Sequence, residues 1–264
     1  MEGKLLSNIK VDDLFYFVFG ITTGEIDNKG LEKAVYKAYL DLSRTIKFRY
    51  SISNLEEKSK DEEKEKDKKA FKDSKKEFID EMKDTIISRI KVYPKNKMPS
   101  WDFTDVSKAF APFQEHSKFD IWHYNLTMDL LIIANKYKNK RLFKDECAFS
   151  CGQAQKWINM TLKYLRIMGI HDEYGFSDSD LHIPMDDYIL TAMRKSKDEK
   201  ICSSYKVKGL GIKDNDKWSQ IENYSTYYKY QSKVRIELNK IDVIPIEWES
   251  QAWIAEATER ANKE

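Results

Sequence analysis

The sequence has few of the residues that build disulfide frameworks or loop-rich folds. Its 264 residues include only three cysteines, five prolines and nine glycines. Cys147, Cys151 and Cys202 are an odd number for a disulfide set, and their spacing matches no structural zinc or iron–sulfur pattern. We therefore expect reduced thiols, as in a cytoplasmic protein, and neither a metal nor a cofactor.

A long hydrophobic run is also missing. The most apolar stretch, residues 14–21, is far shorter than the ~20 residues that cross a bilayer, and no basic leader precedes it. We expect no membrane partner. With 41% hydrophobic residues, the chain can bury one large core or two small ones.

Neither sign of charge dominates, since 46 Lys and Arg face 44 Asp and Glu, for a net charge of +2. That total is weak support for a nucleic-acid partner. The distribution is uneven, however, because residues 131–170 hold eight basic side chains and only two acidic ones. These basic residues are Lys136, Lys138, Lys140, Arg141, Lys144, Lys156, Lys163 and Arg166. Such a local excess favours contacts with phosphates.

Apolar residues recur at helical spacing along most of the chain, whereas alternating strand patterns and long repeats are sparse. The sequence therefore predicts an all-α fold. Helices are expected over residues 30–50, 70–93, 119–137, 153–168, 186–195, 218–238 and 247–261. Residues 195–218, which contain Gly209 and Gly211, are expected to form a long loop.

Two features divide the chain. Residues 54–69 have no apolar side chain after Leu55 and mix both charges densely, which is typical of a solvated helix extension or a charged linker. Pro94 and Pro99 follow and interrupt the helical pattern. We place a boundary there, between an N-terminal helical region (1–93) and a second domain (94–264).

The most informative motif lies in the second domain. Residues 150–156 read Ser-Cys-Gly-Gln-Ala-Gln-Lys and run into a helical pattern, and Ile-Pro-Met-Asp follows at residues 183–186. A glycine turn before a helix leaves backbone N–H groups free to hold a phosphate. A lysine just inside that helix can be half buried, and the later Pro-x-Asp can bring a carboxylate to it.

These two segments resemble the Gly-x-Gly-x-Lys…Val-Pro-Val-Asp signature of the helix-hairpin-helix-GPD DNA glycosylases, especially the 8-oxoguanine DNA glycosylases and their archaeal relatives. The resemblance covers residues 150–190; Ala154 replaces the second hairpin glycine, and Tyr188 stands where a histidine often follows the aspartate. It implies a helix-hairpin-helix glycosylase-like domain that acts on DNA. Some relatives carry a four-cysteine iron–sulfur cluster near the C-terminus, but no cysteine follows Cys202.

The resemblance also implies roles for single residues. Lys156 would attack C1′ of a flipped nucleotide and form a Schiff base, and Asp186 would stabilise the cationic sugar. The hairpin residues Gly152, Gln153, Ala154 and Gln155 would bind DNA through main-chain N–H groups. Each assignment has an alternative: a solvated lysine in a first helical turn, an N-cap aspartate and a simple interhelical turn.

A glycosylase must also hold its extruded base between aromatic or apolar walls. The candidates are Trp122, His123, His182, Trp248 and Trp253, although large aromatic residues at helical spacing more often belong to the core. Two further functions stay open. One is a noncatalytic helix-hairpin-helix module that binds DNA, and the other is a helical protein that binds a protein or RNA partner.

Overall fold

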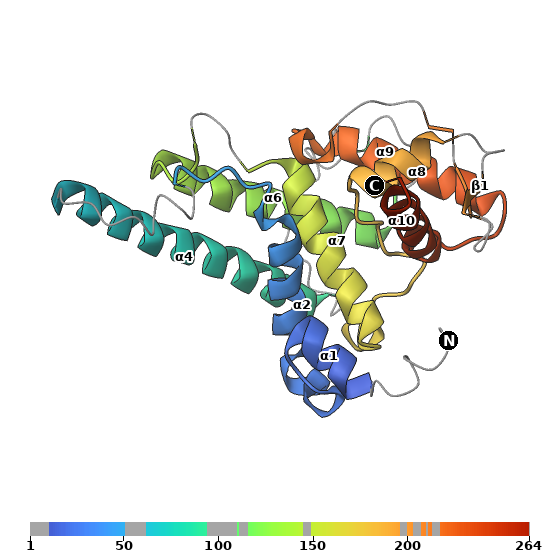
Figure 1. Ribbon diagram of the computed structural model, residues 1–264, viewed down its shortest axis with the longest axis horizontal. Coiled ribbons are helices and arrows are strands. Elements are labelled where there is room, and N and C mark those ends of the chain that lie inside the picture. Colours follow the sequence, from blue (N-terminus) through green and yellow to red (C-terminus); the bar gives the residue numbers. More distant parts are fainter. Residues whose placement is uncertain are drawn as a thin grey trace.

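The protein is all-α, as predicted. The computed structural model describes residues 11–50, 62–93, 110, 116–144, 149–195, 200–202, 207–209, 211–212 and 217–263. Its α-helices are α1 (Val11–Phe19), α2 (Ile26–Ser43), α4 (Glu62–Val92), α6 (Lys118–Asn139), α7 (Cys151–Ile167), α8 (Asp187–Arg194), α9 (Tyr224–Asn239) and α10 (Pro245–Ala261) (Figure 1). Three 3-10 turns accompany them, η2 (Thr23–Glu25), η3 (Asp172–Tyr174) and η4 (Trp218–Gln220), with one antiparallel strand pair, β1 (Lys200–Cys202) and β2 (Val207–Lys208).

The helices between residues 118 and 195 lie close to their predicted positions, whereas α2, α4 and α9 begin or end elsewhere and α1 lies outside the predicted helices. α2 starts before Gly30, because η2 leads directly into it, and it ends at Ser43 rather than at residue 50. The helix expected from Trp218 starts only at Tyr224, where the Asn223 side chain accepts a hydrogen bond from the Thr226 N–H at 2.9 Å. Residues 195–218, which are predicted to form a long loop, contain β1 and β2. Residues 196–199, 203–206, 210 and 213–216 lie outside the described ranges.

Helix α4 includes the second half of the charged stretch 54–69, because it begins at Glu62. It projects from the body of the molecule in Figure 1, and all its buried residues lie at Phe71 or beyond. Residues 62–69 are thus a solvated helix extension, and the linker interpretation is wrong for them; residues 54–61 lie outside the described ranges. Asp67 holds this extension to the segment that follows α2 through hydrogen bonds from Arg49 and Tyr50.

Helices from both sides of the boundary at Pro94 share one hydrophobic core. α2 packs against α7, where the Trp157 indole lies 5.1 Å from the Tyr39 ring and donates to the Val35 carbonyl at 2.9 Å. α4 packs against α6, with the Phe78 and Tyr137 rings 5.5 Å apart. The buried side chains of both regions form a single cluster. The described helices of the N-terminal region therefore support the helix that carries Lys156.

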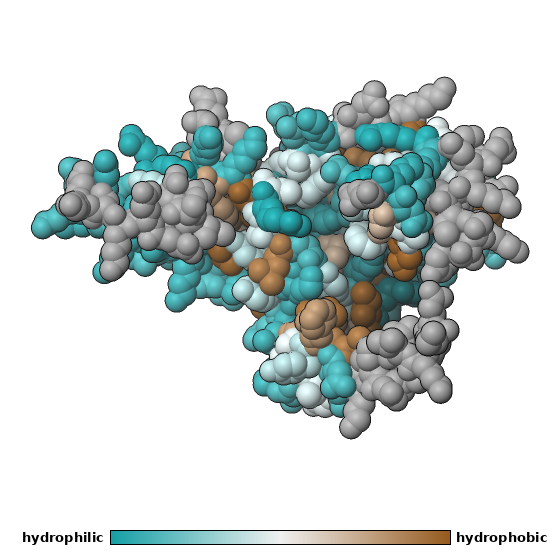
Figure 2. All heavy atoms as spheres, viewed as in Figure 1, coloured by the Kyte–Doolittle hydropathy of each residue, from teal (hydrophilic) through white to brown (hydrophobic). Residues whose placement is uncertain are grey.

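The face of the molecule in Figure 2 is mostly polar where residues are described. Figure 2 shows hydrophilic residues over the α4 arm and apolar surface gathered nearer to α1, where Tyr16 and Phe17 are exposed. No helix in the described ranges combines the length and the apolar character that a bilayer crossing needs.

Candidate active site

Lys156 and Asp186 meet in the folded protein. Lys156 lies in α7, and its Nζ donates to Asp186 Oδ2 at 2.7 Å across a separation of 30 residues. Asp186 also caps α8, since its Oδ1 accepts a hydrogen bond from the Ile189 N–H at 3.0 Å. The predicted convergence of amine and carboxylate is confirmed, and so is the predicted N-cap. One carboxylate satisfies both roles because each of its oxygens has a different donor.

Aromatic side chains border this pair. The Trp253 indole Nε1 donates to Asp186 Oδ2 at 3.1 Å, and the Trp218 ring centroid lies 5.3 Å from Lys156 Nζ. Tyr188 packs against Trp253 with ring centroids 5.1 Å apart. The Lys156 and Asp186 side chains are 8% and 15% exposed, whereas Trp253 is 38% exposed. Trp253 is therefore the part of this site that solvent reaches most easily.

A second ion pair follows two turns further along α7. Lys163 Nζ lies 2.6 Å from Glu249 Oε2 on α10, and the Glu249 side chain is only 1% exposed. Burial raises the pKa of Glu249 above its ordinary value, although the charge and hydrogen bond of Lys163 oppose the shift. The two pairs together join α7 to α8 and α10.

The hairpin prediction is wrong. Ser150 is the N-cap of α7, so Gly152 to Gln155 form the first turn of the helix, and all four residues are buried. Their N–H groups are also occupied: Gly152 donates to the Ile221 carbonyl at 2.9 Å, and Gln153 and Ala154 donate to Ser150. The glycine serves close packing, because a Cβ at position 152 would come within 1.7 Å of the Trp218 carbonyl oxygen. These residues offer no free N–H to a phosphate.

Four of the five candidate pocket residues belong to the core. Trp122, His123, His182 and Trp248 are each at most 4% exposed. Trp122 donates from its indole to the Arg89 carbonyl at 3.3 Å, away from the Lys156–Asp186 pair. Only Trp253 lies beside that pair, so it is the one candidate whose position suits a wall of the site.

A buried polar network replaces the predicted pocket. His182 Nε2 lies 2.6 Å from Asp120 Oδ1, and Arg235 donates to both oxygens of Asp120 at 2.8 and 3.0 Å. Burial alone would raise the pKa of Asp120, but the hydrogen bond from His182 and the charge of Arg235 hold it well below its usual range. Asp120 is therefore ionised, and His182 donates to it from Nε2. Tyr227 then donates to His182 Nδ1 at 2.8 Å.

The second histidine extends this network. His123 Nε2 lies 2.9 Å from Asn159 Oδ1, and its Nδ1 lies 2.9 Å from the Tyr224 hydroxyl. Burial lowers the pKa of His182 to about 4 and that of His123 well below its ordinary value. Both rings are consequently neutral near pH 7. Helical spacing could not reveal this network, because its members come from four separate segments.

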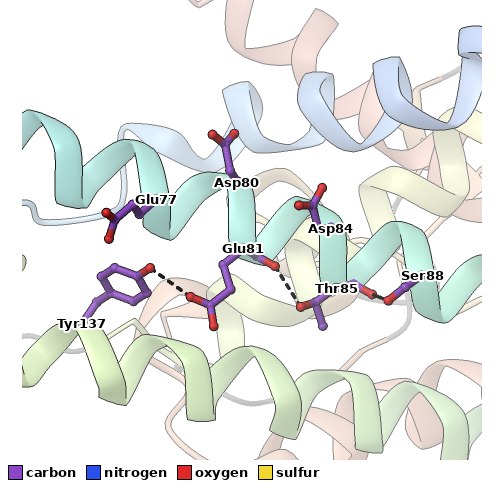
Figure 3. Close-up of a pocket in the computed structure, with 7 residues that line it drawn as sticks. All are labelled: Glu77, Asp80, Glu81, Asp84, Thr85, Ser88 and Tyr137. Carbon is purple, nitrogen blue, oxygen red and sulfur yellow. Dashed lines mark hydrogen bonds between the residues drawn. The ribbon is translucent and has the colours of Figure 1, made fainter.

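Carboxylates neutralise much of the predicted basic patch. Lys136 and Lys140 pair with Glu81 and Glu77 on α4, and Arg166 pairs with Asp178 at 2.8 Å. The α4 carboxylates also line an open groove of about 650 Å³ beside α6 (Figure 3). Its lining residues are Glu77, Asp80, Glu81, Asp84, Thr85, Ser88 and Tyr137. None of the predicted site residues borders this groove.

Other reactive groups are limited. Cys151 is a buried free thiol whose pKa burial raises to about 12, so it is no nucleophile at neutral pH. Within the described ranges, no three His, Cys, Asp or Glu side chains gather where they could hold a metal ion.

Comparisons of the chain with protein-family models, curated proteins and solved structures found no match. The chemistry of the site must therefore be argued from its own residues.

Proposed function

We propose that the Lys156–Asp186 pair is the reacting centre of a DNA glycosylase with AP lyase activity. The observation that carries this proposal is the 2.7 Å contact between Lys156 Nζ and Asp186 Oδ2, beside the rings of Trp218 and Trp253. An amine and a carboxylate held together are what base removal through a covalent sugar intermediate needs. The order of the two residues in the sequence is that of the glycosylase signature.

The reaction begins with loss of the damaged base. The glycosidic bond breaks, the base keeps the electron pair and takes up a proton, and the Lys156 nitrogen bonds to C1′. The nitrogen lone pair then forms a second bond to C1′ while the C1′–O4′ electrons move to O4′. The proton that the nitrogen loses goes to O4′, so the sugar ring opens and an imine remains. Removal of a C2′ proton expels the 3′ phosphate and nicks the strand.

Asp186 acts before and during these steps. As the partner of Lys156, it holds the nitrogen in place and is the nearest acceptor for the proton that the ammonium must lose before it attacks. Its negative charge then lies beside the cationic sugar that develops as the base leaves. The hydrogen bonds from Ile189 and Trp253 fix the orientation of the carboxylate.

Binding to the DNA backbone must come from side chains. Because Gly152 to Gln155 are buried and their N–H groups are occupied, the usual hairpin contact is not part of this proposal. Lys138, Arg141 and Lys144 are exposed at the end of α6 and in the turn after it, and they are candidates for phosphate contacts. Affinity for DNA should then fall steeply with rising salt.

A lesion panel tests this function. Oligonucleotides that each carry one damaged base or one abasic site would be incubated with wild type, Lys156→Gln and Lys163→Gln. Lys163 is the matched control, since it is also a part-buried, ion-paired lysine of α7. We expect strand cleavage on at least one substrate by wild type and Lys163→Gln, and none by Lys156→Gln. Cleavage that survives in Lys156→Gln, or that occurs on no substrate, contradicts the proposal.

A noncatalytic helical binding protein is the second candidate. The observation that favours it is the structural role of the pair itself, because Asp186 caps α8 and joins it to α7 and α10 without any substrate. In that case Lys156→Gln would lower stability and leave the binding of every partner intact. Salt titration distinguishes the partners, since a complex with DNA or RNA weakens steeply with salt and an apolar protein interface does not.

A further inference from the structure

The segment that carries Asp186 to Lys156 is neither helix nor strand. Residues 181–185 lie between η3 and α8 and are buried throughout. A buried backbone without regular structure must find other partners for its N–H and C=O groups. In this segment, three amide side chains supply several of those partners.

Gln231 holds the middle of the segment. This α9 residue is 1% exposed, and its side chain binds both polar groups of Ile183. Its Oε1 accepts from the Ile183 N–H at 3.1 Å, and its Nε2 donates to the Ile183 carbonyl at 2.9 Å. Asn159 of α7 donates to the same carbonyl at 3.2 Å. The backbone N–H and C=O of one residue, Ile183, are therefore held by α7 and α9 together, as a neighbouring strand would hold them.

Gln155 continues this connection to the reacting pair. Its Nε2 makes a long contact of 3.4 Å with the Met185 carbonyl, and its Oε1 accepts from Asn159 at 2.9 Å. Gln155 immediately precedes Lys156, and Met185 immediately precedes Asp186. The amide network thus joins the two backbones one residue before the amine and the carboxylate.

We infer that Gln231, acting with Asn159 and Gln155, is a positioning residue that sets the Asp186 carboxylate against the Lys156 amine. Gln231 touches neither group and acts through the backbone of residues 183–185. As a statement about reaction rate, this inference rests on the proposed function. As a statement about geometry, it can be tested without any substrate.

The substitution Gln231→Glu tests the geometry. Its carboxylate would accept from the Ile183 N–H but repel the Ile183 carbonyl, and the segment should move. Lys156 would then lose its partner, and its nitrogen would be more accessible to a reagent. We expect an amine-acylating reagent to modify Lys156 in the folded variant roughly tenfold faster than in wild type. Mass spectrometry of digested protein gives the rate for each lysine.

Lys163 is the internal control for this measurement. It also lies on α7 and pairs with Glu249 of α10 at 2.6 Å, so a shift of residues 183–185 would leave its own partner in place. A faster reaction at Lys156 with an unchanged rate at Lys163 supports the positioning role. Unchanged rates at both lysines, or an equal increase at both, overturn it. If Gln231→Glu does not fold, Gln231→Asn replaces it, because its amide is one methylene too short to reach both groups of Ile183.

A second measurement separates this inference from the proposed function. The same proteins would be tested for cleavage of DNA with an abasic site and for DNA affinity. We expect cleavage by the variant to slow roughly tenfold, with an unchanged Kd, since misplaced reacting groups lower rate rather than binding. Altered labelling of Lys156 with no cleavage even by wild type would remove the proposed function and leave the positioning role standing. Unchanged labelling of Lys156 together with normal cleavage would overturn the positioning role and leave the proposed function standing.

Discussion

Gly152 lies directly against the carbonyl of Trp218. A Cβ built on Gly152 would be 1.7 Å from that oxygen, and the Gly152 N–H donates to the Ile221 carbonyl at 2.9 Å. The turn η4 is thereby packed onto the first turn of α7, and it brings the Trp218 ring over Lys156. The glycine of the motif therefore shapes the site through packing rather than through an exposed turn.

We expect Gly152→Ala to lower the free energy of unfolding by about 3 kcal/mol, because a backbone carbonyl cannot move aside as a flexible side chain can. Urea denaturation measures the change. Gly24→Ala is the matched control, since a Cβ there meets nothing within 4 Å. Equal stabilities for the two variants would show that η4 does not pack against Gly152 in solution.

The buried histidines predict a loss of stability in mild acid. The folded protein holds the pKa of His182 at about 4, against 6.5 for a free histidine, and that of His123 is also depressed. Between these values the unfolded chain binds more protons than the folded protein, so stability decreases as pH falls. The slope should approach about 1.4 kcal/mol per pH unit for each histidine. Asp120 adds little in this window, because its carboxyl group is ionised in both states above its ordinary pKa of 3.8.

Urea unfolding at pH 7, 6 and 5 would measure this slope. His123→Gln should reduce it by about half, since one of the two proton-linked groups is gone. A free energy of unfolding that stays constant or increases between pH 7 and pH 5 would contradict the buried, neutral state of these histidines.

The Lys163–Glu249 pair predicts a strong asymmetry between single and double substitutions. Lys163→Met should cost about 3 kcal/mol, because Glu249 is left buried and unpaired. Lys163→Met combined with Glu249→Leu should recover most of that loss, since no charge remains to be buried. A double-mutant cycle by chemical denaturation checks this. Additive losses in the double variant would mean that the two side chains do not interact.

The sequence predicted the parts of this protein that depend on local pattern. Helical periodicity located α6 and α7 closely, and the Pro-x-Asp before an apolar run predicted Asp186 as the N-cap of α8. The convergence of Lys156 and Asp186 came from the order of two motifs. Local pattern sufficed here because capping and amphipathic burial involve residues that are close in the chain.

The features that the sequence did not predict depend on contacts between residues that are far apart in the chain. The sequence indicates a turn at Gly152, because nothing near this residue in the chain shows that Trp218 packs against it. The sequence makes His123 and His182 candidates for pocket walls, whereas in the fold Asn159 and Asp120 are their hydrogen-bond partners inside the core. The basic excess of residues 131–170 is partly neutralised by α4 carboxylates, which are distant in the sequence. Each of these outcomes depends on tertiary packing.

Trapping of the covalent intermediate tests the central claim most directly. Wild-type protein would be incubated with DNA that contains an abasic site, or a lesion found in the panel, in the presence of borohydride, and the modified peptide would be identified by mass spectrometry. We predict a stable protein–DNA adduct on Lys156, its loss in Lys156→Gln, its retention in Lys163→Gln and its slower formation in Asp186→Asn. An adduct on another residue, an equal yield from Lys156→Gln, or no adduct on any substrate would contradict the assignment of Lys156 as the nucleophile.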